Sequence, residues 1–91
     1  MDTKTKISLL EKMSRELDDI INSQTSLLKK ISQLEAENMN LGNSVLENRL
    51  PDIHAKVDEG IAEIKLVIEE FTEVKDKFIS ENPVEEEGGS L

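Results

Sequence analysis

A seven-residue repeat of apolar side chains runs through the first half of the chain and constrains its fold more than any other feature. When Leu10 is placed at position a of a heptad, nine of the twelve a and d positions between Leu10 and Asn48 hold Leu, Ile, Val or Met. A helix with this repeat carries an apolar stripe along one side and must bury that stripe against other helices. The sequence therefore predicts an all-α protein that contains a coiled coil.

The composition agrees with this prediction. Of the 91 residues, 36% are hydrophobic and 34% charged, and the aromatic residues are two Phe with no Tyr or Trp. Such a composition is typical of long amphipathic helices and unusual for a β-sandwich or barrel. A chain of this length buries only a thin core, so we expect it to associate with a second copy. The sequence holds no Cys, which excludes disulfides and thiolate metal sites.

Glycine and proline divide the chain. Asp2, Thr3 or Thr5 can cap a first helix, which meets no Gly or Pro before Gly42. Residues 1–50 are therefore predicted to form an N-terminal coiled-coil helix and a break, with Ser44 and Glu47 at capping-box spacing. Proline is favoured in the first turn of a helix, so a second amphipathic helix is predicted over residues 51–80, beginning at Pro51. Residues 81–91, with three consecutive Glu and two Gly, are predicted to be a disordered acidic tail.

Two apolar rows are predicted to make the contacts. The predicted dimer seam is the a and d row of the first helix: Leu10, Met13, Leu17, Ile20, Gln24, Leu27, Ile31, Leu34, Asn38 and Leu41. The second helix offers a row for packing or for a partner protein: Val57, Ile61, Ile64, Ile68, Phe71 and Phe78. The two rows do not share one register, which requires a break between residues 42 and 51. We expect a helical hairpin that dimerises into a four-helix bundle; the alternative is a segmented, parallel coiled-coil rod.

One polar residue lies in the apolar row. Asn38 occupies position a between Ile31 and Leu41. A buried amide is costly unless another polar group pairs with it. A parallel, in-register dimer would place Asn38 opposite its own copy and so fix the register. The alternative is that Asn38 marks a frayed helix end before Gly42.

The net charge limits the possible partners. The chain carries a formal charge of −9, and residues 51–91 hold four basic and twelve acidic side chains. Such a surface repels nucleic acids and anionic lipid, so we expect no direct nucleic-acid or membrane binding. It favours a basic protein partner. No run approaches the roughly 18 apolar residues of a membrane span, and a cytoplasmic location is expected.

Two short segments resemble known motifs. The segment "LEAENMNL" resembles the leucine zipper of basic-zipper transcription factors, but only Lys4 and Lys6 are basic before Leu10, so zipper-type DNA binding is not expected. The segment "SRELD" resembles the Ser-x-x-x-Asp signature of small sporulation phosphatases, which dephosphorylate response regulators. In that family the motif lies on the second helix, whereas here it lies on the first. The resemblance implies a functional role for Asp18.

The sequence otherwise offers little chemistry. The single His54 has Asp52 and Asp58 nearby, too few ligands for a structural zinc site. Paired carboxylates are consecutive and do not converge on a pocket. We therefore expect no catalytic residues, metal or cofactor, and a non-enzymatic oligomerisation or adaptor protein that binds partners through helical surfaces. The alternatives are an acidic inhibitor that imitates nucleic acid on a basic surface, and an aspartyl-phosphate phosphatase.

Overall fold

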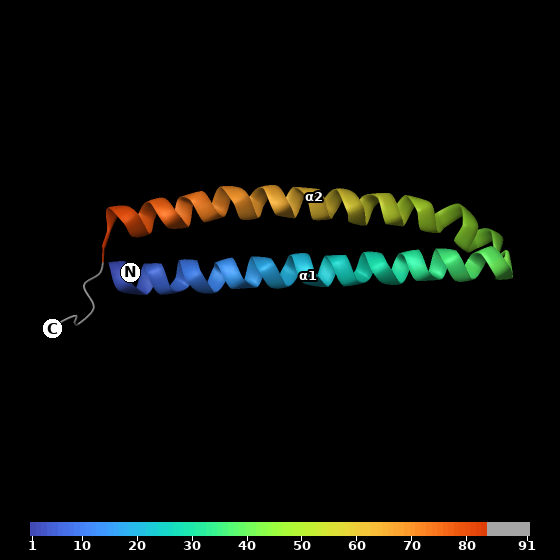
Figure 1. The fold of residues 1–91 in the computed structure, drawn as a ribbon, viewed down its shortest axis with the longest axis horizontal. Coiled ribbons are helices and arrows are strands. Elements are labelled where there is room, and N and C mark those ends of the chain that lie inside the picture. Colours follow the sequence, from blue (N-terminus) through green and yellow to red (C-terminus); the bar gives the residue numbers. More distant parts are fainter. Residues whose placement is uncertain (84–91) are drawn as a thin grey trace.

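Two long helices lie side by side and antiparallel over nearly the whole chain (Figure 1). The computed structural model describes residues 1–83, with helix α1 at Thr3–Leu41 and helix α2 at Ser44–Glu81. The chain measures 67 × 20 × 17 Å. The predicted all-α helical hairpin is confirmed, and the alternative rod is wrong because α2 folds back along α1. The predicted acidic tail lies, from residue 84 onward, outside the described residues.

A turn of two residues joins the helices. Gly42 ends α1 in the left-handed conformation, with φ 72° and ψ 30°, and its N–H donates to the carbonyl oxygen of Asn38 at 2.7 Å. Glycine adopts this conformation without the steric cost that a Cβ imposes. Asn43 then begins α2, because its side chain accepts a hydrogen bond from the N–H of Leu46 at 3.1 Å. Asn43 is thus the N-cap, in place of the predicted capping box at Ser44 and Glu47.

The second helix begins earlier than predicted. It starts at Ser44, and Pro51 lies inside it where a start was expected. A proline in a helix interior cannot donate to the carbonyl four residues before, here that of Glu47, and it bends the helix. The first turns of α2 bend toward α1 in this region (Figure 1). The Asn43 cap and the burial of Leu50, which is 7% exposed, offset the cost of the proline.

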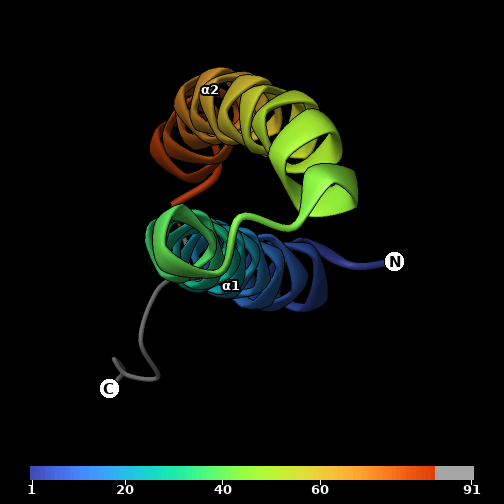
Figure 2. The same ribbon diagram turned by 90° about the vertical axis from the view of Figure 1, so that its right-hand side faces the viewer.

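The contact between the helices follows alternating steps of three and four residues. On α1 the side chains that α2 covers wholly or partly are Ile7, Leu10, Ser14, Leu17, Ile21, Gln24, Leu28, Ile31, Glu35 and Asn38. On α2 the matching set is Leu46, Leu50, His54, Val57, Ile61, Ile64, Ile68, Phe71, Lys75 and Phe78. We call this contact the hairpin seam. Seen along its length, the chain is a single pair of helices, so each helix has one neighbour (Figure 2).

The N-terminus of α1 has its own cap. The carboxylate of Asp2 accepts a hydrogen bond from the N–H of Thr5 at 2.7 Å. Hydrogen bonds from the side chain and the backbone of Thr5 hold the pKa of Asp2 below its ordinary value of 3.8. Asp2 is therefore the cap among the three predicted candidates. The ammonium of Lys6, near the start of α1, lies 4.4 Å from the ring centroid of Phe78, near the end of α2. This cation–π contact joins the two helices at the open end of the hairpin.

Candidate interaction surface

Polar pairs at two levels of the seam fix the register of the helices. Lys75 donates to the hydroxyl of Ser14 at 3.5 Å, and His54 Nδ1 lies 2.9 Å from a carboxylate oxygen of Glu35. Moving 21 residues up α1, from Ser14 to Glu35, corresponds to moving 21 residues down α2, from Lys75 to His54. The two helices therefore stay in one constant antiparallel register between these levels.

Asn38 has a different partner from the one predicted. Its side chain is 7% exposed and makes two hydrogen bonds to the backbone of Asn43. The amide nitrogen donates to the Asn43 carbonyl at 3.0 Å, and the amide oxygen accepts from the Asn43 N–H at 2.9 Å. The amide thereby closes the turn within one chain. In the structure the Asn38 amide is bonded neither to a second Asn38, as predicted, nor to water at a frayed helix end, the alternative, but to the backbone of its own turn.

The predicted dimer seam divides into two groups in the structure. Its a positions face α2 in the hairpin seam: Leu10, Leu17, Gln24, Ile31 and Asn38. Its d positions stay exposed: Met13 (40%), Ile20 (44%), Leu27 (43%), Leu34 (45%) and Leu41 (74%). Ile21 and Leu28, which flank the row, replace the d positions in the seam. The partner helix α2 therefore covers only one edge of the apolar stripe of α1.

Helix α2 shows the same division. Its predicted row lies in the hairpin seam: Val57, Ile61, Ile64, Ile68, Phe71 and Phe78. A second row at seven-residue spacing lies outside the seam: Ile53 (46%), Val67 (49%) and Val74 (58%) are exposed, and Gly60 between them is half-buried. Together with Met13, Ile20, Leu27 and Leu34 of α1, this row forms a surface that we call the open face.

The two rows of the open face lie on the same side of the hairpin. Met13 and Leu34 directly precede Ser14 and Glu35, and their counterparts on α2 directly precede Lys75 and His54. The four layers across the hairpin are Met13 with Val74, Ile20 with Val67, Leu27 with Gly60, and Leu34 with Ile53; in the register of Ser14 with Lys75, the two members of each layer are offset by two residues, or about 3 Å. A groove of about 310 Å³ between the helices confirms this placement, since Met13, Ile20 and Val67 line it over a floor of Leu17 and Phe71.

The opposite side of the hairpin is polar. For each α1 residue of the open face, the residue two positions earlier lies equally far from the hairpin seam but on the opposite side of the hairpin. These residues are Glu11, Asp18, Thr25 and Ser32, all exposed. Those of α2 are likewise mostly polar: Pro51, Asp58, Lys65 and Thr72. The two sides lie equally far from the seam, yet on the open face every position except Gly60 is apolar. Single exposed apolar residues are common in proteins, but a complete row of them is not, so the open face is a distinct feature of the sequence.

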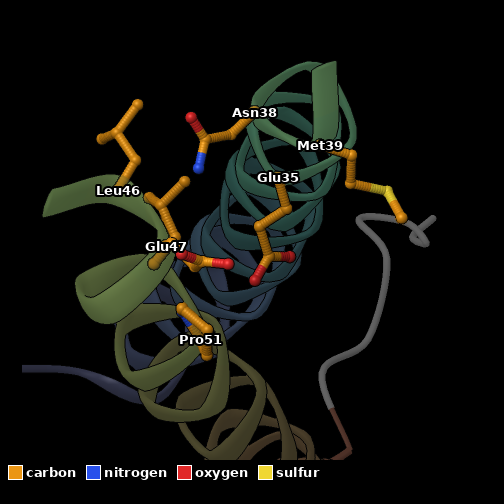
Figure 3. A pocket seen from close by; sticks show the side chains of 7 residues that line it. Glu35, Asn38, Met39, Leu46, Glu47 and Pro51 are labelled. Atoms are coloured by element: carbon orange, nitrogen blue, oxygen red, sulfur yellow. The ribbon is translucent and has the colours of Figure 1, made fainter. Parts of the chain in front are cut away.

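A second, smaller hollow lies beside the turn. It measures about 160 Å³ and is lined by Glu35, Asn38, Met39, Leu46, Glu47, Leu50 and Pro51. The carboxylates of Glu35 and Glu47 extend toward each other, and Met39 points away (Figure 3). Within residues 1–83 no group of three or more His, Asp or Glu side chains is placed to hold a metal ion.

The residues of the phosphatase-like signature are separated in the structure. Ser14 is partly buried in the hairpin seam beside Lys75, whereas Asp18 is exposed on the polar side. His54 pairs with Glu35 of the other helix rather than with its own neighbours Asp52 and Asp58. Asp52 instead lies 3.4 Å from the ammonium of Lys56.

Sequence reasoning missed the second row as a separate surface. Ile53, Val67 and Val74 are not part of the row predicted for the second helix. Their seven-residue spacing was the available signal, but its meaning depends on which edge of α2 faces α1.

Comparisons with protein-family models, with curated proteins and with solved structures find no match to this chain. Among the described residues, no helix combines the length and apolar character needed to cross a bilayer.

Proposed function

We propose that this chain is a non-enzymatic oligomerisation or adaptor protein that binds the helices of other protein molecules through its open face. The observation that supports this is the contrast between the two sides of the hairpin. One side carries apolar residues at seven of eight layer positions, and the other is largely charged or hydroxylated.

The size of the open face also favours association. It spans about 32 Å along the hairpin, from 21 residues at 1.5 Å each, and it is two helices wide. Continuous apolar surfaces of this kind mark interaction sites in soluble proteins. Helices dock onto such surfaces with apolar side chains repeating every three, four or seven residues, which is the spacing that the open face itself presents.

Association through the open face also completes the packing of the hairpin. A pair of helices buries one edge of each apolar stripe, and further helices are needed to cover a wider stripe. In a bundle, a third or fourth helix would cover the half-exposed Leu27 of α1 and Val67 of α2.

Thiol labelling in the cells that make the protein tests this function whatever the partner is. The chain has no native Cys, so Leu27→Cys reports on the open face and Thr25→Cys is a matched control in the same turn on the polar side. We expect the thiol of Leu27→Cys to react at least several-fold more slowly than that of Thr25→Cys. Equal rates in cells would contradict the proposed function.

A further inference from the structure

Resting on the proposed function, we infer that the open face binds a second copy of this chain, turned so that α1 lies antiparallel on α1 of the other copy and α2 on α2. The pattern of charges along both edges of the open face supports this arrangement over the alternative.

Two symmetric arrangements can bring two open faces together. Homodimers generally have a two-fold axis, which makes the same patch complementary to itself. If the axis runs across the helices, α1 covers α1 and α2 covers α2, each antiparallel. If the axis runs along the helices, α1 of one copy covers α2 of the other. In both cases the four apolar layers of each copy overlap to within about two residues.

Charged residues border the open face at regular positions. A residue three positions after a row residue lies on the outer side of it, whereas one four positions after lies toward the seam. The outer residues are Glu16, Ser23, Lys30 and Glu37 on α1, and Lys56, Glu63, Glu70 and Lys77 on α2; all are exposed. We call these eight residues the rim. They would meet the rim of whatever covers the open face.

The first arrangement pairs opposite charges along the rim. Its axis passes between the Ile20 and Leu27 layers, so that Met13 meets Leu34 of the second copy and Ile20 meets Leu27. Glu16 then lies within one residue of the level of Lys30 of the second copy. On the other helix Lys56 reaches Glu70 in the same way. The symmetry repeats each pair, giving four attractive pairs. The like-charged meetings are Glu63 with its own copy and, at the two ends, Lys77 with Arg49.

The second arrangement brings like charges together. Residues at the same level of α1 and α2 then face each other, so that Glu16 meets Glu70 and Lys30 meets Lys56 of the second copy. Each of these meetings occurs twice, and the attractive meeting is that of Glu37 with Arg49. Like charges at an interface rim oppose association and exclude wrong pairings. The rim therefore discriminates between the two arrangements even though the apolar rows fit both.

The glycine of the open face also fits the first arrangement. Gly60 leaves a notch in the α2 row, and a Cβ built there meets no atom within 4 Å. With the axis across the helices, Val67 of the second copy lies over Gly60. A branched side chain then fills the space that the missing side chain leaves open.

A charge exchange at the rim tests the inference with opposite signs for the two arrangements. The dissociation constant of the purified full chain is measured by sedimentation equilibrium at low salt. Glu16→Lys and Lys30→Glu should each weaken the dimer by about tenfold, since two symmetric pairs become repulsive. The double variant, which restores both pairs and the net charge, should return to within about threefold of the wild type.

The control is Asp19→Lys, which changes the net charge by the same amount as Glu16→Lys but lies on the outward side of α1. It should not weaken the dimer. All of these positions are exposed, and helix content by circular dichroism verifies that each variant is folded. A tighter dimer for Glu16→Lys would overturn the inference in favour of the second arrangement.

Crosslinking gives a second, independent readout. Ser23 meets its own copy in the first arrangement, so Ser23→Cys alone should crosslink with a short bismaleimide. In the second arrangement Ser23 meets Glu63, and a crosslink would form only on mixing Ser23→Cys with Glu63→Cys. A wild-type chain that stays monomeric at millimolar concentration would also overturn the inference. The labelling experiment in cells would still judge the proposed function separately.

Discussion

Replacing Asn38 by valine should change the stability of the protein in opposite directions depending on whether Asn38 lies in a coiled-coil dimer interface or closes the turn of the hairpin. In a parallel coiled-coil dimer, valine at this position would raise stability and loosen the choice of oligomer. In the hairpin, the Asn38 amide makes hydrogen bonds of 3.0 and 2.9 Å to the carbonyl and N–H of Asn43. Asn38→Val removes both, so stability should fall.

The expected loss follows from these two bonds. A hydrogen bond contributes about 1 kcal/mol net, and Asn43 is exposed enough for water to satisfy its backbone in the variant. Asparagine and valine have similar helix propensities, so little else changes. The free energy of unfolding should therefore fall by about 2 kcal/mol, which lowers Tm by on the order of 10 °C for a domain of this size.

The assay is urea unfolding followed by circular dichroism at several protein concentrations, because association adds to apparent stability. Asn40→Val is the matched control, since Asn40 is exposed in the same last turn of α1. Asn38→Asp keeps an acceptor for the Asn43 N–H but loses the donor to the Asn43 carbonyl, and its loss should be intermediate. An Asn38→Val protein as stable as Asn40→Val, or more stable than the wild type, would refute the role of Asn38 in the turn.

Other expected outcomes concern the two glycines and the first cap. Gly42→Ala should lower the free energy of unfolding by about 1 kcal/mol because its φ of 72° is strained for a residue with a Cβ, while no atom lies within 4 Å of the added methyl. Gly60→Ala should raise the free energy of unfolding of the dissociated chain by about 1 kcal/mol, because alanine is the better helix former in a helix interior; urea unfolding of both variants at high dilution checks the two signs. The lowered pKa of Asp2 means that the folded chain holds this carboxylate ionised more strongly than the unfolded chain does. The cap's contribution is therefore complete above pH 3.8 and is lost as pH falls through the lowered pKa, so amide exchange at Thr5 should accelerate there, and Asp2→Ala should abolish that dependence.

The heptad repeat and the helix-breaking residues predict two long helices and the break between them, and the structure confirms both. The heptad from Leu10 onward predicts a long helix, and Gly42 with Asn43 marks its end. Helix α2 begins seven residues before Pro51, the start predicted from the preference of proline for the first turn of a helix. Asn43 caps the helix earlier, and packing of Leu50 on α1 holds the extra turns in place. The cost of Pro51 in the helix interior can be compared with the gain from burying Leu50 only when the position of α1 is known.

The residue pattern alone shows that the apolar residues form stripes wider than one helix contact can bury, and that a turn interrupts them after Leu41. Which edge of each stripe faces the other helix is visible only in the folded pair. The short turn, with its amide from Asn38, sets the rotation and register of α2, so that Ile21 and Leu28 enter the seam and Ile20 and Leu27 stay outside. A heptad pattern is local to one helix, whereas the choice of edge depends on two helices at once.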